Sequence, residues 1–215
     1  MRYEKRENNR RRGSLKVVGV YGFNNTSRMV LSLAVAKQLS EKCNTLFVNF
    51  ETFGGFKGIL KGEEEQNLSD ALYAFRQNHN QFHYDRLDYI PDTSCADDID
   101  DIKAEELGTF VQGIGRELGY SYIVVDIGDG LRMPWNMMDC FDEIYMCDGD
   151  NYLEKSKVRN FENMVMERGM NNVVSAFKKI AVKIEDNILN PDMWNMLPFC
   201  SFYDELCSLI ETGET

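Results

Sequence analysis

The sequence predicts an α/β fold with a mostly parallel central sheet of six to eight strands and helices on both faces. Short apolar runs alternate along the chain with segments of helical periodicity, which is the pattern of a layered α/β domain. The apolar runs are continuous rather than alternating, as expected for parallel strands covered on both faces. The first run leads through a glycine into a helix and then into a second run within about 35 residues, the length of a right-handed βαβ unit.

The first βαβ unit is the clearest part of this pattern. Residues 15–22 (LKVVGVYG) read as a buried strand that ends at Gly22, and residues 27–42 (SRMVLSLAVAKQLSEK) repeat apolar side chains at helical spacing. Residues 45–50 (TLFVNF) read as the second strand. The sequence therefore predicts a strand, a tight turn, a helix and a parallel strand.

The alternation continues to the end of the chain. Helices are predicted over 53–60 (FGGFKGIL) and 67–77 (NLSDALYAFRQ), where Asn67 or Ser69 is a suitable N-cap. Further strands are predicted over 87–91, 120–130, 143–148 and 179–184. Further helices are predicted over 104–118, 151–168 and 201–211.

Composition restricts the class of protein. The 215 residues suit one domain, with 43% hydrophobic and 27% charged residues, and no apolar run approaches the roughly 20 residues that span a bilayer. The start of the chain has no hydrophobic stretch typical of a secretory signal, so we expect a cytoplasmic protein without membrane insertion. The six cysteines form no C-x-x-C pair and are expected to be reduced thiols.

The net charge of −11 is unevenly distributed. Residues 1–13 carry six basic and two acidic groups, and the rest of the chain carries 18 basic and 33 acidic groups. We therefore divide the chain into a basic flexible arm, 1–14, and a folded domain, 15–215. Most of such an acidic surface repels nucleic acid, so a nucleic-acid partner is not expected.

The turn after the first strand has the spacing of a phosphate-binding P-loop, G-x-x-x-x-G-K-[S/T]. Gly22 is followed by four residues and then by Ser27, Arg28 and Met29. Ser27 replaces the second glycine, Arg28 replaces the lysine, and Met29 replaces the hydroxyl that would bind magnesium. The candidate ligand-binding residues of this loop are Gly22, Phe23, Asn24, Asn25, Thr26, Ser27, Arg28 and Met29.

Two other strand ends belong to the same predicted edge of the sheet, because ligands of parallel sheets sit beyond the carboxyl ends of the strands. One is the segment NFETFGGF, which contains Glu51, and the other is DIGDG, which contains Asp126 and Gly130. In NTPases, an aspartate at the end of this strand commonly contacts the coordination shell of the magnesium ion. A glycine four residues later can present its amide to a terminal phosphate.

These segments, KVVGVYGFNNTSRMVLSLAVAKQL, TLFVNFETFGGF, LSDALYAFRQ and YSYIVVDIGDG, resemble the ParA/MinD-like P-loop ATPases in their order and spacing. Over about residues 15–212 the chain is most similar to the ATPase domain of the CpaE/TadZ pilus-assembly proteins. The resemblance implies a nucleotide-sandwich homodimer, or protein partners in a secretion or pilus apparatus. It leaves open whether a receiver-like domain, common upstream in the pilus relatives, precedes the basic arm.

The resemblance also gives each site residue a place in the family pattern. Arg28 stands at the phosphate lysine, Met29 at the magnesium hydroxyl, and Phe23 or Asn24 at the family's extra lysine. Asn49 and Glu51 match the two acidic positions after the second strand, and Asp126 and Gly130 match the D-x-x-x-G switch. The departures at Arg28 and Met29 predict weak or no hydrolysis, no metal site and no catalytic residue. The candidate ligands are ATP, ADP or a phosphate-like anion.

Several features have simpler interpretations. Arg28 is also consistent with a surface residue at a helix start, and Asp126 with a turn cap. His79 and His83 are spaced i, i+4 but lack a third metal ligand, and the acidic run around 97–101 lacks the glycine and glutamate of a calcium loop. The C-terminal segment 201–215 contains no Lys or Arg, so a MinD-like membrane anchor is not expected.

Three functions remain open at this point. The first is a degenerate ATPase domain that acts as an interaction and localisation module, in pilus assembly or polar positioning. The second is an active but atypical ATPase that uses Arg28 for phosphate and Asp126 for metal. The third is a DNA-partitioning protein that uses the arm and the basic stretch Lys178, Lys179 and Lys183.

Overall fold

The computed structural model describes residues 14–51, 55–56, 59–60, 67–76, 87–90, 99, 103–128, 134–149, 151–184 and 188–212. The predicted basic arm lies outside these residues except for its last position, Ser14. The five described cysteines are free thiols.

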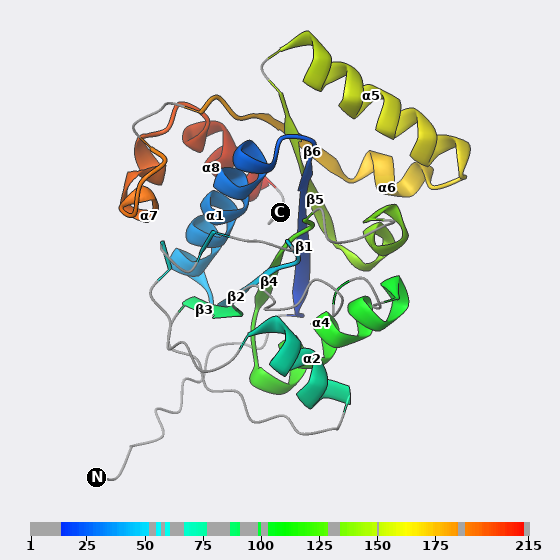
Figure 1. The fold of residues 1–215 in the computed structure, drawn as a ribbon, viewed down its shortest axis with the longest axis vertical. Helices are drawn as coiled ribbons and strands as arrows, with labels where there is room; N and C mark the ends of the chain where they lie inside the picture. The colour runs from blue at the N-terminus through cyan, green and yellow to red at the C-terminus, as the bar shows by residue number, and fades with distance from the viewer. Residues whose placement is uncertain are drawn as a thin grey trace.

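The described strands form one sheet of six, in the order β3-β2-β4-β1-β5-β6, and every neighbouring pair is parallel (Figure 1). The predicted parallel sheet is therefore confirmed. β1 lies in the middle, between β4 and β5, as expected for its continuous apolar sequence. The strands span Lys16–Gly22 (β1), Thr45–Asn49 (β2), Leu87–Ile90 (β3), Tyr122–Asp126 (β4), Glu143–Asp148 (β5) and Phe177–Ala181 (β6).

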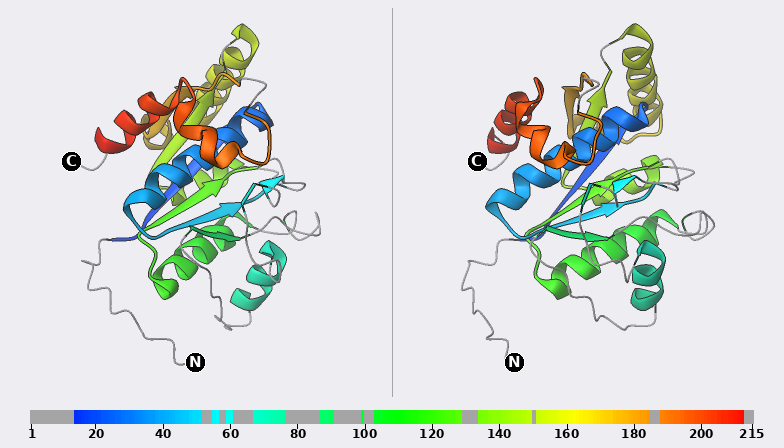
Figure 2. Two further views of the ribbon diagram at one scale, coloured as in Figure 1. Left: turned by 90° about the vertical axis from the view of Figure 1, so that its left-hand side faces the viewer. Right: turned by 60° about the vertical axis from the view of Figure 1, so that its left-hand side comes forward.

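Helices cover both faces of the sheet (Figure 2). One face carries α1 with α7, η3 and α8, and the other carries α2, α4, η2 and α5. The helices span Asn25–Lys42 (α1), Leu68–Arg76 (α2), Ala104–Leu118 (α4), Pro134–Cys140 (η2), Tyr152–Glu167 (α5), Asn171–Ser175 (α6), Met193–Met196 (α7), Leu197–Phe199 (η3) and Tyr203–Thr212 (α8).

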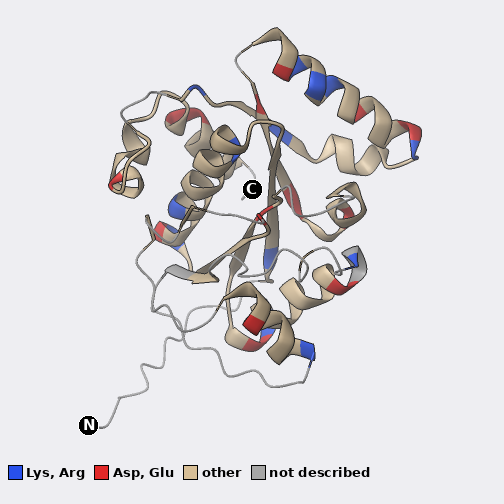
Figure 3. Ribbon diagram, viewed as in Figure 1, with Lys and Arg blue, Asp and Glu red and all other residues tan. Residues whose placement is uncertain are grey.

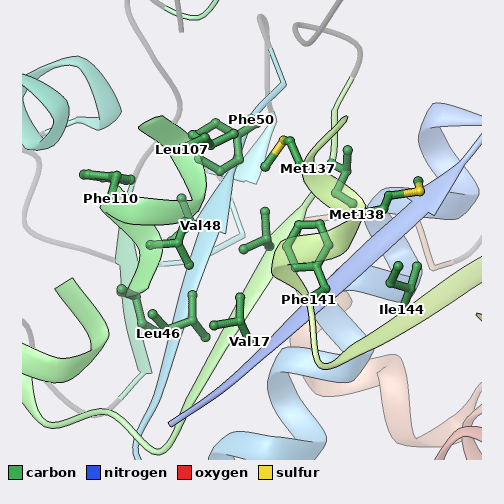
Figure 4. Close-up of a cluster of buried hydrophobic side chains, with 14 of the residues drawn as sticks. Val17, Leu46, Val48, Phe50, Leu107, Phe110, Met137, Met138, Phe141 and Ile144 are labelled. Atoms are coloured by element: carbon green, nitrogen blue, oxygen red, sulfur yellow. The ribbon is translucent and has the colours of Figure 1, made fainter. Parts of the chain in front are cut away.

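Alternate strand residues supply two separate cores. Val17 of β1 belongs to the cluster under α4 and η2, whereas its neighbour Val18 belongs to the cluster under α1. Figure 4 shows the first cluster, in which Leu107 and Phe110 of α4 pack toward Leu46 and Val48 of β2. Because successive side chains of a strand point to opposite faces, a continuous apolar strand is needed to fill both cores.

One predicted helix is described only in part, and one predicted strand has different ends. Of the helix predicted over 53–60 the structure describes residues 55, 56, 59 and 60, where the Phe56 carbonyl accepts hydrogen bonds from the amides of Ile59 and Leu60, as in a helical turn. The Phe56 ring packs against Phe47. The sixth strand begins at Phe177 rather than residue 179, because its pairing with β5 starts there.

Residues at the helix ends explain why α2 and α4 were predicted well. Asn67 caps α2: the Asp70 amide donates to Asn67 Oδ1 at 3.1 Å, and the Asn67 amide donates back to the Asp70 carboxylate at 3.1 Å. Residues 104–118 form α4, which ends at Gly119 in the left-handed conformation with φ 76°. The short helices η2, α6, α7 and η3 were not predicted, since each has too few residues for a periodic signal.

Candidate functional site

The turn between β1 and α1 is very short. β1 ends at Gly22, α1 begins at Asn25, and only Phe23 and Asn24 lie between them. Asn24 caps the helix: its Oδ1 accepts a hydrogen bond from the Ser27 amide at 3.1 Å, and its carbonyl accepts from the Arg28 amide at 2.9 Å. Asn25, Thr26 and Ser27 are therefore part of the helix, where the P-loop spacing had placed loop residues.

Gly22 allows β1 to approach β5 at this turn. A Cβ atom on Gly22 would lie 2.6 Å from the Cβ of Cys147 on β5. No side chain fits in this space, so the glycine is required by packing between neighbouring strands.

Arg28 lies in the first turn of α1 with its side chain in the protein interior and is only 1% exposed. Its Nε donates to Asp126 Oδ1 at 2.7 Å, and its Nη2 lies 3.2 Å from Glu51 Oε2. Its Nη1 donates to Asn25 Oδ1 at 2.9 Å. The guanidinium is thus held by two carboxylates and an amide of the same chain.

The sheet order brings the two carboxylates to Arg28. β4 pairs with both β1 and β2, and the register places Asp126 opposite Val20 on one side and Asn49 on the other. Glu51 follows the end of β2, and its amide donates to Asn49 Oδ1 at 3.0 Å. Both acidic side chains are buried, Asp126 completely and Glu51 with 6% exposure.

The chain segments after β2 and β4 touch each other. The Phe50 amide donates to the Asp126 carbonyl at 3.0 Å, and a Cβ on Gly128 would lie 2.5 Å from the backbone of Glu51. A glycine is needed at 128 for this approach, because any larger residue would clash with backbone atoms that cannot move aside.

The start of α5 contributes a third acid to the turn. Asn24 Nδ2 donates to Glu154 Oε1 at 3.0 Å, and Glu154 is itself held by α5's cap, Asn151, whose Oδ1 accepts from the Glu154 amide at 3.0 Å. The described surroundings of the turn therefore hold one arginine and three carboxylates, Glu51, Asp126 and Glu154. Such a cluster repels an added anion more than it attracts one.

Burial changes the titration of two groups at this edge. Burial raises the pKa of the Cys147 thiol to about 12, helped by the negative charges of Glu154 and Asp148. Burial also raises the pKa of the Tyr21 hydroxyl, although the Arg28 charge lowers it in part. Both groups therefore keep their protons at neutral pH.

The other predicted site residues lie in different surroundings. Phe23 packs edge-on against Tyr21 and Phe161, with ring centroids 5.5 Å and 5.7 Å away, and Thr26 is exposed to solvent. Met29 packs against the core on the α1 side, next to Gly55. Gly130 lies outside the described residues, as do His79, His83 and the four aspartates of the run 97–101.

Two other kinds of feature are absent from the described residues. No group of three or more His, Cys, Asp or Glu side chains in the described ranges could hold a metal ion. No helix in the part of the chain that the structure describes has the length and hydropathy to cross a membrane.

Sequence reasoning missed three residues near the turn: Glu154, Trp135 and Lys157. The Asn-x-x-Glu pattern at 151–154 marks a helix start, but its contact with Asn24 joins residues 130 positions apart. Trp135 and Lys157 line a cavity beside Gly22 that only the packing of η2 and α5 creates.

Comparisons with known proteins identify the fold of this chain but do not assign the chain to a family. No family model matches the chain, and no curated protein sequence matches it. A plasmid partition protein from Borrelia burgdorferi bound to AMPPNP is 14% identical, with a TM-score of 0.64 over 93% of this chain and 99% of that one. The MinC:MinD cell division complex of Aquifex aeolicus is 14% identical, with a TM-score of 0.60 over 85% and 77%. A ParA family ATPase from Chlorobium tepidum is 18% identical, with a TM-score of 0.57 over 85% and 80%. At these identities the likeness is one of fold: the chain has the α/β fold of ParA and MinD proteins.

Proposed function

We propose that this chain is a degenerate ParA/MinD-like domain that acts as an interaction and localisation module, with weak or no nucleotide hydrolysis. One observation carries the proposal: Arg28, at the position of the phosphate-binding lysine, makes buried ion pairs with Asp126 and Glu51. The groups that an active enzyme would direct at a nucleotide are here bonded to one another.

The cost of releasing Arg28 supports this proposal. Removing one partner of a buried ion pair costs about 3–5 kcal/mol, because the remaining charge is left uncompensated. Arg28 would have to leave Asp126 and Glu51 in order to reach a phosphate. Since about 1.4 kcal/mol corresponds to a factor of ten in affinity, that loss alone would weaken nucleotide binding by a factor of about a hundred or more.

The residues also fit magnesium poorly. Met29 offers a thioether where a hydroxyl would bind Mg²⁺, and a hard cation prefers oxygen ligands. The Asp126 carboxylate, the other candidate ligand, already accepts a hydrogen bond from Arg28 Nε. Phosphoryl transfer depends on both a metal and a phosphate-binding cation, so we derive no catalytic step here.

The assignment of a specific cellular role rests on the resemblance of the sequence to a known group of proteins. We propose a place among proteins of the CpaE/TadZ kind, in pilus assembly or polar positioning, with a second copy of the chain or another protein of that apparatus as partner. The neighbouring MinD structure is a complex with MinC. By analogy, this fold supports partner binding as well as nucleotide binding.

Titration calorimetry with Mg-ATP tests the proposal. We expect no binding heat, or only weak binding that inorganic phosphate reproduces. A phosphate-release assay should give no turnover above a blank. A sub-micromolar affinity for Mg-ATP, or turnover that disappears in Asp126→Asn, would establish the atypical ATPase instead.

The DNA-partitioning alternative loses part of its basis. Lys178 Nζ lies 2.8 Å from Glu143, and Lys179 Nζ lies 2.7 Å from Glu162. Two of the three lysines proposed for DNA contact are therefore paired with acids. A gel shift at low salt should show no retarded DNA.

A further inference from the structure

A cavity of about 700 Å³ lies beside the Gly22–Asn25 turn, between α5 and the carboxyl ends of β1 and β4. Its volume falls within the range of about 300–1,000 Å³ that is usual for small-molecule sites. Figure 1 shows α5 standing apart from α1 and α8.

One stripe of α5 forms a wall of the cavity. Lys157, Asn160, Phe161 and Met164 all line it, and their spacing of i, i+3, i+4 and i+7 places them on one face of the helix. This face is partly apolar and partly polar. The Phe161 ring and the Met164 thioether lie beside the Lys157 ammonium group and the Asn160 amide. Figure 3 shows both basic and acidic residues on α5.

Three further aromatic side chains line the cavity. Tyr21 and Phe23 contribute rings from the end of β1 and the turn, and Trp135 contributes the indole of η2. The Tyr21 and Phe161 centroids are 4.9 Å apart, so Tyr21 packs directly against the α5 face. The Arg168 guanidinium lies 4.9 Å from the centre of the Trp135 ring, which places a cation beside the indole.

The acids near the turn, Glu51, Asp126 and Glu154, do not line the cavity itself. Its described lining contains Lys157 and Arg28 but no Asp or Glu. The Arg28 charge is compensated by Asp126 and Glu51, whereas no ion pair of Lys157 occurs among the residues that the structure describes. Lys157 is exposed, so its ammonium group can turn toward a ligand.

The Trp135 indole adds a hydrogen-bond donor. Its Nε1 is buried and has no acceptor within the described part of the chain. An unsatisfied buried donor costs about 1–3 kcal/mol. A ligand oxygen within hydrogen-bond distance of Nε1 would remove that cost.

We propose that this cavity binds a planar aromatic carboxylate. The ring system lies among Tyr21, Phe161 and Trp135, and the carboxylate lies beside Lys157. Gly22, Phe23, Asn25 and Arg28 of the predicted phosphate loop line one part of the cavity, whereas Lys157 and Trp135, on which the proposal rests, lie outside that loop.

The probe pair for the test is 2-naphthoate and 2-naphthamide, which have the same ring and nearly the same shape but differ in charge. Calorimetry on the full chain should give saturable binding of naphthoate and binding of naphthamide at least tenfold weaker. Lys157→Met should weaken naphthoate binding about tenfold without changing that of naphthamide. Trp135→Leu should weaken both ligands.

Lys155→Met is the matched control, since Lys155 is an exposed lysine of the same helix that does not line the cavity. It should change neither affinity, and circular dichroism should show that all variants stay folded. The proposal is wrong if naphthoate gives no heat at millimolar concentration, or if Lys157→Met leaves its affinity unchanged. It is also wrong if Mg-ATP displaces naphthoate, because the cavity would then be part of a nucleotide site.

Discussion

Arg28 Nε donates a hydrogen bond of 2.7 Å to Asp126 Oδ1, and the two side chains are buried at the carboxyl edge of the sheet. The bond joins the first turn of α1 to the end of β4. Glu51, after β2, completes the cluster.

Loss of Arg28 should destabilise the protein strongly. Arg28→Met leaves Asp126 and Glu51 buried without their cation, so we expect the free energy of unfolding to fall by about 3–5 kcal/mol in a urea titration. The control is Arg76→Met, because Arg76 Nε also contacts a carboxylate, that of Glu106, at 2.6 Å but lies at the surface. That exposed pair should contribute about 1 kcal/mol or less. Equal losses in the two variants would contradict the importance of the buried cluster.

Nucleotide should not stabilise the folded chain. A ligand present at 1,000 times its Kd adds about 4.1 kcal/mol. For a chain of this size that corresponds to a rise in Tm of about 8–16 °C. We expect 1 mM Mg-ATP to shift Tm by less than about 1 °C relative to magnesium alone, because Arg28 is already bonded within the protein. A rise of several degrees that requires both magnesium and the triphosphate would contradict the proposed function.

Gly22→Ala should weaken the contact between β1 and β5. The added methyl group would lie 2.6 Å from Cys147 Cβ, so we expect a loss of about 1–3 kcal/mol by denaturant titration. The double variant Gly22→Ala/Cys147→Gly removes the opposing Cβ and should recover part of this loss. Gly55→Ala is the control, because its nearest atom would be Met29 Cε at an ordinary 3.7 Å. Equal effects of Gly22→Ala and Gly55→Ala would refute the packing argument.

Alkaline pH should destabilise the protein through Cys147. Burial raises the pKa of its thiol in the folded chain from 9.0 to about 12. Between these values the unfolded chain loses a proton that the folded chain keeps, so the free energy of unfolding falls by up to about 1.4 kcal/mol per pH unit. Below pH 9 both states keep the proton and the full contribution is present. Cys147→Ala should make the decline between pH 9 and 11 shallower, whatever its effect on stability at pH 7. Identical slopes would rule out this thiol as a cause.

The sequence predicted most of the fold, because its signals are local. Continuous apolar runs indicated the parallel strands, and the predicted strand 143–148 agrees with β5 at both ends. The failures have tertiary causes. The ends of the last strand are set by its pairing with β5, which begins at Phe177 and ends at Ala181.

The candidate site was predicted in part for the same reason. Ligands of parallel sheets bind beyond the carboxyl ends of the strands, and this predicted that Arg28, Glu51 and Asp126 lie at one edge of the sheet. The structure places them there. The position at the strand ends does not indicate the direction of the Arg28 side chain. That direction follows from the early start of α1 at Asn25, which depends on the Asn24 cap and its contact with Glu154.

The contact of the β2 and β4 ends has a consequence for exchange of backbone protons with deuterium. Loops at the binding edge of a sheet usually open at low free-energy cost and exchange quickly. Here the Phe50 amide is bonded to the Asp126 carbonyl, behind the ion pairs of Arg28. This proton should therefore exchange as slowly as those in the middle of β1, so that the most protected layer of the molecule extends to its carboxyl edge.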